Sequence, residues 1–141
     1  MTFTYQRTIR LSETDATGVL YFAELLKLAE EAFEAFLHTK NFTVNDLIEN
    51  TPFLMPIVHA EADYAAPLKV GDVVDIELCL GEVGESSFTL QSYLLKEGVE
   101  AGRTKIIHVV ISKETGQGIP IPESVSTFLE ALRSPQCCSE S

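Results

Sequence analysis

Apolar and polar positions follow two different periods in the N-terminal part of the chain. In residues 3–11, FTYQRTIRL, a period of two places four apolar side chains on one face: Phe3, Tyr5, Ile9 and Leu11. This alternation predicts a half-buried β-strand. From about Leu20 to Leu37 the apolar residues recur instead at steps of three and four, with charged residues between them. That spacing predicts one amphipathic helix of about four to five turns.

Four more strand-like stretches and a short helix follow. The stretches cover residues 57–67, 73–80, 86–96 and 103–113. Turn signals separate them, and the segment EGVEAG at 97–102 predicts a hairpin loop. Pro122 then opens a short helix over residues 123–132. We assign all of these elements to one domain, residues 1–133, and expect the polar tail at 134–141 to be disordered.

The order of the elements indicates the fold class. A strand, a long helix, four antiparallel strands and a short helix are typical of an α+β domain in two layers. The long helix has an apolar stripe that it cannot bury alone. We therefore expect the antiparallel five-stranded sheet to curl around this one central helix.

The charge balance limits the partners of the protein. Ten Lys and Arg stand against 21 Asp and Glu, which gives a formal net charge of −11. We expect no nucleic acid partner, because phosphate binding needs a basic face, and no anionic membrane partner for the same reason. No signal peptide and no membrane-spanning run is apparent. These features favour a cytoplasmic protein.

The cysteines and histidines do not predict a metal site. Cys79 lies in a predicted strand, while Cys137 and Cys138 are adjacent in the tail, a spacing that fits neither a zinc site nor a CxxC redox pair. We expect reduced thiols, as in a cytoplasmic protein. The histidines are dispersed, and no two have the i, i+4 spacing of a helical metal site. We therefore expect no bound metal.

The features ahead of and after the long helix resemble the hotdog-fold thioesterases related to 4-hydroxybenzoyl-CoA thioesterase. The motifs that carry the resemblance are D-x-x-G-x-x-Y at 15–21, A-D-Y-A-A-P at 62–67, Gly-Asp at 71–72, G-E-S-S-F at 84–88 and E-T-G at 114–116. The resemblance covers about residues 4–132. Within the family, L-Y-F at 20–22 and F-L-M-P-I-V-H-A at 53–60 are similar to the 1,4-dihydroxy-2-naphthoyl-CoA thioesterases of the cyanobacterial phylloquinone pathway. Many relatives in other branches have His or Tyr where Phe22 stands here.

The resemblance implies an acyl-CoA thioesterase that hydrolyses an aryl thioester, with 1,4-dihydroxy-2-naphthoyl-CoA favoured. It gives Asp15 the role of nucleophile or general base and gives the backbone N–H of Phe22 the role of oxyanion donor, which the Phe22 side chain does not affect. Gly18 and Tyr21 become candidates for substrate binding. No cofactor is implied, because coenzyme A is part of the substrate. Members of the family are dimers or tetramers with active sites between subunits, so a homo-oligomer is expected.

The residues around Asp15 allow two interpretations by themselves. A carboxylate can attack a thioester carbonyl or activate water, while the N–H groups at a helix start hold the developing oxyanion. Gly18 permits the tight turn that this arrangement needs. An Asp before a helix can also simply cap it or close an Asx turn, with Thr14 and Thr17 assisting. The motif context favours the reactive role.

Four further residues are candidates for substrate contacts. His59, on a predicted strand, either hydrogen-bonds an oxygen of the acyl group or is an ordinary exposed strand histidine. Lys96, Arg103 and Lys105 cluster around one predicted hairpin. They either meet the phosphates of coenzyme A or protect a solvated sheet edge by their charge.

Rival functions remain open at this point. The enzymatic rivals are a short- or medium-chain acyl-CoA thioesterase and a thioesterase acting on acyl carrier protein, whose acidic surface this chain would repel unless its basic residues are exposed. A hotdog dehydratase is less favoured, because no His stands beside Asp15. A noncatalytic acyl-CoA-binding module is the alternative outside enzymes, and it predicts binding without turnover.

Overall fold

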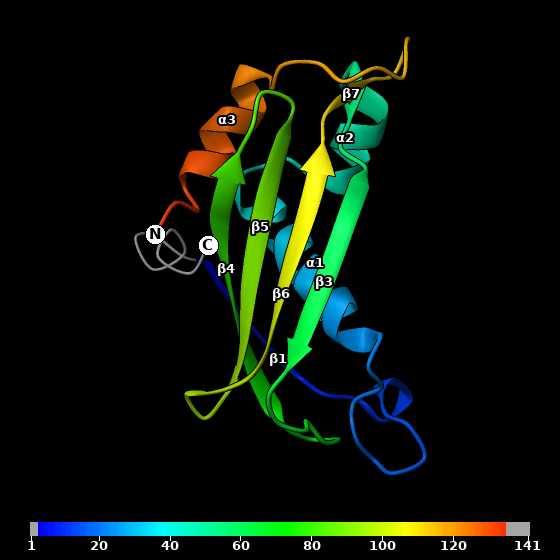
Figure 1. Cartoon of the computed structure of the whole chain (residues 1–141), viewed down its shortest axis with the longest axis vertical. Coiled ribbons are helices and arrows are strands. Elements are labelled where there is room, and N and C mark those ends of the chain that lie inside the picture. The colour runs from blue at the N-terminus through cyan, green and yellow to red at the C-terminus, as the bar shows by residue number, and fades with distance from the viewer. Residues whose placement is uncertain (1–2, 135–141) are drawn as a thin grey trace.

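The computed structural model describes residues 3–134 and has the expected two-layer α+β architecture (Figure 1). Five antiparallel strands form one sheet in the order β1-β4-β5-β6-β3. Their bounds are β1 Phe3–Thr8, β3 Ile57–Tyr64, β4 Val73–Val83, β5 Ser87–Lys96 and β6 Val99–Val109. The other elements are the 3₁₀ turn η1 Leu11–Glu13, the helices α1 Glu24–Thr39, α2 Val44–Asn50 and α3 Glu123–Glu130, and a small ribbon of β2 Phe53–Leu54 with β7 Ile111–Ser112.

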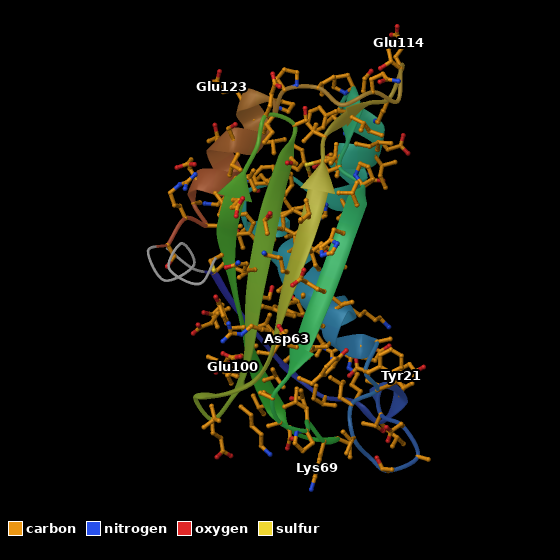
Figure 2. All side chains as sticks on the ribbon, viewed as in Figure 1. Tyr21, Asp63, Lys69, Glu100, Glu114 and Glu123 are labelled. Atoms are coloured by element: carbon orange, nitrogen blue, oxygen red, sulfur yellow. The ribbon has the colours of Figure 1, made fainter. Side chains whose placement is uncertain are left out.

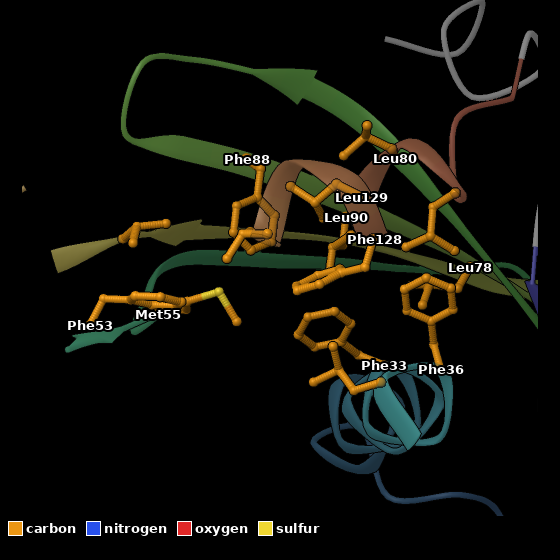
Figure 3. Close-up of a cluster of buried hydrophobic side chains, with 14 residues drawn as sticks. Phe33, Phe36, Phe53, Met55, Leu78, Leu80, Phe88, Leu90, Phe128 and Leu129 are labelled. Carbon is orange, nitrogen blue, oxygen red and sulfur yellow. The ribbon is translucent and has the colours of Figure 1, made fainter. Parts of the chain in front are cut away.

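The helix α1 lies against one face of the sheet, and its apolar stripe forms the centre of the core (Figure 1). The buried residues of α1 keep the predicted three- and four-residue steps: Leu25, Leu28, Ala29, Ala32, Phe33, Phe36 and Leu37. Figure 3 shows Phe33 and Phe36 pointing from α1 toward Phe128 of α3, with ring centroids 6.5 and 6.2 Å from that of Phe128. Burying one such side chain stabilises the fold by about 1.5–3 kcal/mol, so this stripe holds the helix on the sheet.

A second group of buried residues packs around the N-terminal half of α1. Its members are Ile9, Leu20, Leu25, Leu28, Ala32, Leu68, Val74, Ile76, Leu94 and Ala101. Leu20 belongs to the loop ahead of the helix, and its N–H donates to the carbonyl of Leu68 at 2.7 Å. The loop is therefore anchored to the core immediately after the Thr/Gly turn.

Several boundaries differ from the sequence expectation, and two of these differences change the local conformation. The first strand ends three residues early, so Leu11 does not point inward; it opens η1 and is 74% exposed. The expected six-residue loop between β5 and β6 consists of Glu97 and Gly98 alone, whose φ angles are 51° and 79°. Two successive residues with positive φ match the twist of paired strands, so a two-residue turn replaces the longer loop.

The strand β3 stands at the edge of the sheet. It pairs with β6 on one side only, and all of its residues except Ala62 are exposed. Apolar side chains are among them, with Ile57, Val58 and Tyr64 exposed to 46%, 59% and 53%. Natural sheets generally cover or charge such an edge, because its open N–H and C=O groups can pair with another strand.

The C-terminal part of the described chain runs beside β4 next to Cys79. The N–H of Leu80 donates to the carbonyl of Leu132 at 2.9 Å, and Leu80 forms a parallel bridge with Arg133. Cys79 is disulfide-bonded, so the expectation of reduced thiols is wrong for this residue. Spacing rules for cysteines describe neighbours in sequence, and they carry no information on a pairing that the fold creates.

The predicted tail lies almost wholly outside the described residues. Ser134 is buried, whereas residues 135–141, which include Cys137 and Cys138, are not described. The helices within residues 3–134 include none that is long and apolar enough to cross a membrane.

Candidate active site

The residues ahead of α1 fold as a narrow, hairpin-like loop. The contacts that cross it are Tyr21 N–H to Glu13 O at 2.9 Å, an antiparallel bridge between Thr14 and Leu20, and Asp15 N–H to Val19 O at 2.9 Å. At the tip, the Gly18 N–H donates to the Asp15 carbonyl at 3.0 Å, and Gly18 has a φ of +81°. A Cβ on Gly18 would meet no atom within 4 Å. Glycine is therefore needed here for its backbone conformation and not for space.

The Asp15 carboxylate is exposed at the tip of this loop, with one oxygen bonded and one open. Its Oδ1 accepts the Thr17 hydroxyl at 2.5 Å and the Thr17 N–H at 2.8 Å, while Oδ2 accepts no hydrogen bond from the described residues. The Thr17 hydroxyl, followed by the Thr17 N–H, holds the pKa of Asp15 below its usual value. Asp15 is thus ionised at neutral pH, with an oxygen able to attack a carbon or accept a proton.

Asp15 does not cap the long helix. α1 begins at Glu24, with Ala23 at the N-cap position, so the helix starts later than the expected Leu20. A turn closed by the Glu24 N–H and the Tyr21 carbonyl at 2.9 Å lies between them. The Asx turn that the sequence also allowed is present, because the Thr17 N–H bonds the Asp15 carboxylate. That turn orients the carboxylate and leaves Oδ2 available.

The main-chain N–H of Phe22 donates no hydrogen bond to any of the described residues, and Phe22 is 63% exposed. Its carbonyl, in contrast, accepts a hydrogen bond from the Tyr64 hydroxyl at the end of β3. The ring of Tyr21 packs on that of Phe22, with centroids 4.7 Å apart. The backbone at Phe22 is therefore held in place while its N–H remains available, as an oxyanion site requires. No hydrogen bond joins the Asp15 side chain to Phe22 directly; the loop connects them.

An apolar pocket of about 310 Å³ adjoins this loop. Its walls come from Val19 and Leu20 of the loop, Leu25 of α1, residues 64–68 and Ala101. Asp15 is not part of the wall, but Val19 accepts the Asp15 N–H, so the pocket begins beside the carboxylate turn. Figure 2 shows Tyr21 and Lys69 at this end of the molecule, far from Glu114 and Glu123.

His59 lies away from the loop within a single chain. Residues 59, 61 and 63 alternate with 60, 62 and 64 along β3, so His59 is on the opposite face from Tyr64. Five steps along a strand separate the two residues by about 16 Å. The His59 Nε2 lies 2.7 Å from the Glu61 carboxylate, and both side chains are about half exposed. No group of three or more His, Cys, Asp or Glu in residues 3–134 is arranged to hold a metal ion.

The three basic candidates do not form one cluster. Lys96 pairs with Asp72 at 3.1 Å at the end of β5. Arg103 pairs with Glu100 of its own strand at 2.9 Å. Arg103 and Lys105 together line a small polar pocket of about 140 Å³ on the sheet. The structure brings these two together and leaves Lys96 apart, and the phosphate-binding role of all three stays a prediction.

Sequence reasoning did not single out Arg7, whose side chain bonds Glu13 of the loop at 2.6 and 2.5 Å. A signal was present, because Arg7 occupies the inward position between Tyr5 and Ile9 in the alternating pattern of residues 3–11. A charged side chain that points inward must find a charged partner. The alternation therefore indicates a buried ion pair, although it does not name the partner.

A family model described as the thioesterase-like superfamily matches residues 9–129. The match includes the Asp15 loop, α1 and every strand of the large sheet except β1. This chain belongs to the thioesterase-like superfamily. The thioesterase relatives of the chain are similar to it along nearly its whole length.

Three thioesterases show the extent of this similarity. A 1,4-dihydroxy-2-naphthoyl-CoA hydrolase from Microcystis aeruginosa is 34% identical over 128 residues, which are 91% of this chain and 93% of that protein. The crystal structure of a 1,4-dihydroxy-2-naphthoyl-CoA thioesterase from Synechocystis matches with a TM-score of 0.87 at 28% identity, over 96% of this chain and 100% of that one. The structure of a gentisyl-coenzyme A thioesterase matches with a TM-score of 0.78 at 28% identity, over 87% and 98%. The hotdog thioesterase fold expected from the sequence is confirmed.

Proposed function

We propose that this protein is an acyl-CoA thioesterase that hydrolyses an aryl thioester. The favoured substrate is 1,4-dihydroxy-2-naphthoyl-CoA, which would give 1,4-dihydroxy-2-naphthoate and coenzyme A. Asp15 acts as nucleophile or general base, and the Phe22 N–H polarises the thioester carbonyl. No cofactor takes part in this reaction, because coenzyme A is itself part of the substrate.

The proposal rests on two groups of one cross-linked loop that accept or donate no hydrogen bond within residues 3–134: a carboxylate oxygen of Asp15 and the main-chain N–H of Phe22. Asp15 is ionised, and its Oδ2 has no partner among the described residues. Hydrolysis of a thioester develops negative charge on the carbonyl oxygen, and a preorganised N–H such as that of Phe22 stabilises this charge. Both components of a minimal hydrolytic site therefore belong to the same segment of chain.

Each role of Asp15 gives a balanced reaction. As general base, Asp15 accepts a proton from water while the water oxygen bonds to the carbonyl carbon; the C–S bond then breaks, and the departing thiolate takes the proton. As nucleophile, Asp15 Oδ2 bonds to the carbonyl carbon and the C–S bond breaks, which leaves a mixed anhydride that water hydrolyses. In both routes the Phe22 N–H donates to the same oxygen.

An aryl acyl group suits the pocket beside the loop. The pocket of about 310 Å³ is lined by Leu, Val, Ala and Pro side chains together with the Tyr64 ring, and such walls favour an apolar group. The names of the relatives agree with this chemistry, because two of them act on a naphthoyl thioester and one on a gentisyl thioester. These points support an aryl substrate over a short aliphatic one.

We extend the proposal to a homo-oligomer, a dimer or tetramer, whose copies meet along the open edge of β3. Ile57 and Val58 are exposed on that edge, and Tyr64 of the same strand bonds Phe22 of the loop. A second copy paired there would lie beside the loop and cover the exposed Phe22 ring. Location in the cytoplasm stays a prediction, and the disulfide at Cys79 removes one of its supports, since disulfides are rare in that compartment.

The proposal is tested by measuring release of free coenzyme A from a panel of acyl-CoAs. The panel contains 1,4-dihydroxy-2-naphthoyl-CoA, gentisyl-CoA, short- and medium-chain acyl-CoAs and an acyl carrier protein thioester. We expect the highest kcat/KM with the naphthoyl substrate. A preference for an aliphatic or carrier-bound group would overturn the substrate assignment, and tight binding without turnover of any substrate would make the protein an acyl-CoA-binding module.

A further inference from the structure

Arg7 of β1 belongs to a largely buried ion-pair cluster beside the Asp15 loop. An arginine has five N–H donors, and Arg7 uses all of them. Nε and Nη2 bond the Glu31 carboxylate at 2.8 and 3.0 Å, Nη1 and Nη2 bond the Glu13 carboxylate at 2.6 and 2.5 Å, and Nη1 also reaches the Thr8 carbonyl at 3.2 Å. Paired bonds to each carboxylate fix both the position and the orientation of the guanidinium.

Glu13 connects this cluster to both arms of the loop. Its Oε1 also accepts the N–H of Arg10 at 2.8 Å, and its main-chain carbonyl accepts the N–H of Tyr21 at 2.9 Å. Glu13 precedes Asp15 by two residues, and Tyr21 directly precedes Phe22. The position of Glu13 therefore determines the positions of both arms of the loop, one with the Asp15 carboxylate and the other with the Phe22 N–H.

The cluster also sets the position of the loop against the helix. Glu31 lies in α1, Arg7 in β1 and Glu13 in η1, so three elements meet in one network. The side chains of Arg7 and Glu13 are only 10% and 6% exposed. Exposed ion pairs contribute little to structure, but breaking a buried pair leaves an unpaired charge that the chain must rearrange to accommodate. The segment able to rearrange here is the loop.

We infer that Arg7 is a positioning residue for the reaction: through Glu13 it holds Asp15 and the Phe22 N–H in register, without touching the substrate. The inference rests on the proposed hydrolysis of a thioester at this loop. A merely structural arginine would change the stability of the protein and leave the turnover of the folded enzyme as it was.

The variant Arg7→Lys keeps the positive charge and replaces the planar fork by a single ammonium group. We expect kcat to fall by about ten- to a hundredfold, because a misplacement of about 1 Å between reacting groups has an effect of that size. KM should change little, because all five N–H donors of Arg7 are already bonded within the protein and none is left for a substrate. The acid limb of the pH–rate profile should stay in place, because the hydrogen bonds that lower the pKa of Asp15 come mainly from Thr17, with smaller contributions from the N–H groups of Val19 and Asp15, and none comes from Arg7.

Amide hydrogen exchange supplies a readout that needs no substrate. In Arg7→Lys we expect the Tyr21 N–H to exchange at least an order of magnitude faster than in the wild type, while the amides of the central strands keep their protection. Glu13→Gln weakens the same ion pair from the side of Glu13. It replaces Arg7→Lys as the test variant if Arg7→Lys does not fold. Arg133→Lys controls for the same substitution at an exposed ion pair away from the loop, since Arg133 is 46% exposed and pairs with Glu130 at 2.8 Å near the end of α3.

The outcomes separate this inference from the proposed function. A folded Arg7→Lys protein with wild-type kcat and wild-type exchange at Tyr21 overturns the inference, as does a loss confined to KM or an equal loss of kcat in Arg133→Lys. If the wild type hydrolyses no thioester, the proposed function fails instead. The exchange rate at Tyr21 then decides alone whether Arg7 holds the loop.

Discussion

The hydroxyl of Tyr64, at the end of β3, donates a hydrogen bond to the main-chain carbonyl of Phe22, just ahead of α1. The two residues are 42 positions apart in the sequence. This contact ties the edge strand of the sheet to the segment whose Phe22 N–H has no partner within residues 3–134. The backbone at Phe22, our proposed oxyanion donor, is therefore held from two directions, by Tyr64 on its carbonyl side and by the bond of Tyr21 to Glu13 on the other.

Tyr64→Phe removes this one hydroxyl and keeps the ring in the pocket wall. We expect kcat to fall by about tenfold, less than the hundredfold or more that follows loss of an oxyanion donor itself. The free energy of unfolding should change by no more than about 1 kcal/mol, because a single hydrogen bond contributes about that amount. Steady-state kinetics and urea unfolding measure the two effects. Tyr5→Phe on β1 is the control, and an equal loss of kcat there would contradict the role of Tyr64.

Thr17→Val removes the hydroxyl that bonds Asp15 Oδ1 and leaves the backbone N–H of residue 17 in place. The Thr17 hydroxyl is the main cause of the lowered pKa of Asp15, so its loss should raise that pKa toward the usual value. The carboxylate would then become protonated at a higher pH, and the acid limb of kcat/KM should move to higher pH. Thr17→Ser retains a hydroxyl and should keep the wild-type limb. An unchanged limb in Thr17→Val would show that Asp15 does not control it.

His108 makes the stability of the fold depend on pH. Burial lowers its pKa below the usual 6.5, although a hydrogen bond with the Met55 carbonyl opposes the shift. Between 6.5 and the folded-state pKa, the unfolded chain binds a proton that the folded chain does not. Stability is therefore fully present above about pH 6.5 and decreases as the pH falls through that window. The free energy of unfolding of His108→Gln should vary less steeply with pH there.

The comparison with His108→Gln also isolates this residue from other groups. Burial raises the pKa of Glu30, so the contribution of Glu30 to stability decreases as the pH rises, opposite to that of His108. Both the wild type and His108→Gln contain Glu30, so the difference between their stability curves does not include its contribution. His38→Gln, at an exposed position, serves as the control for replacing a histidine by glutamine. Identical slopes for His108→Gln and the wild type would contradict the assignment.

Val58→Glu places a charge on the open edge of β3. If copies of the chain meet along this edge, the variant should have a lower mass by sedimentation or light scattering, and its turnover should decrease with the loss of the assembly. Val99→Glu is the control, since Val99 is also an exposed strand valine, at 67%, beside the β5–β6 hairpin. A wild type that is monomeric at micromolar concentration would contradict the proposed assembly.

Much of the fold was predictable because it depends on local periodicity. The two-residue period of residues 3–11 and the helical period that ends near Leu37 both correspond to elements of the structure. The errors arose at boundaries, where a single conformation decides the outcome. The φ of 51° at Glu97 allows the short hairpin. The pattern of apolar residues does not predict a positive φ at a glutamate.

The site was predictable only in part for a different reason. Asp15, Gly18 and the Phe22 N–H lie on one short loop, so a motif in the sequence contains them together. The bonds from Arg7 and Tyr64 cross from distant elements, and their partners depend on how strands and helices pack. The inward position of Arg7 indicated that a partner was needed, but only the fold identifies Glu13 and Glu31 as those partners.

The most direct test of the account is the rate of coenzyme A release from 1,4-dihydroxy-2-naphthoyl-CoA by the wild type and by Asp15→Asn. Asn keeps the size of the side chain and an oxygen that can accept the Thr17 hydrogen bonds, but it is neither a nucleophile nor a base. We predict that kcat falls by about a hundredfold or more, with the fold intact by circular dichroism. A wild type that releases no coenzyme A, or an Asp15→Asn variant that retains the wild-type rate, would contradict the assignment of Asp15 as the reactive carboxylate.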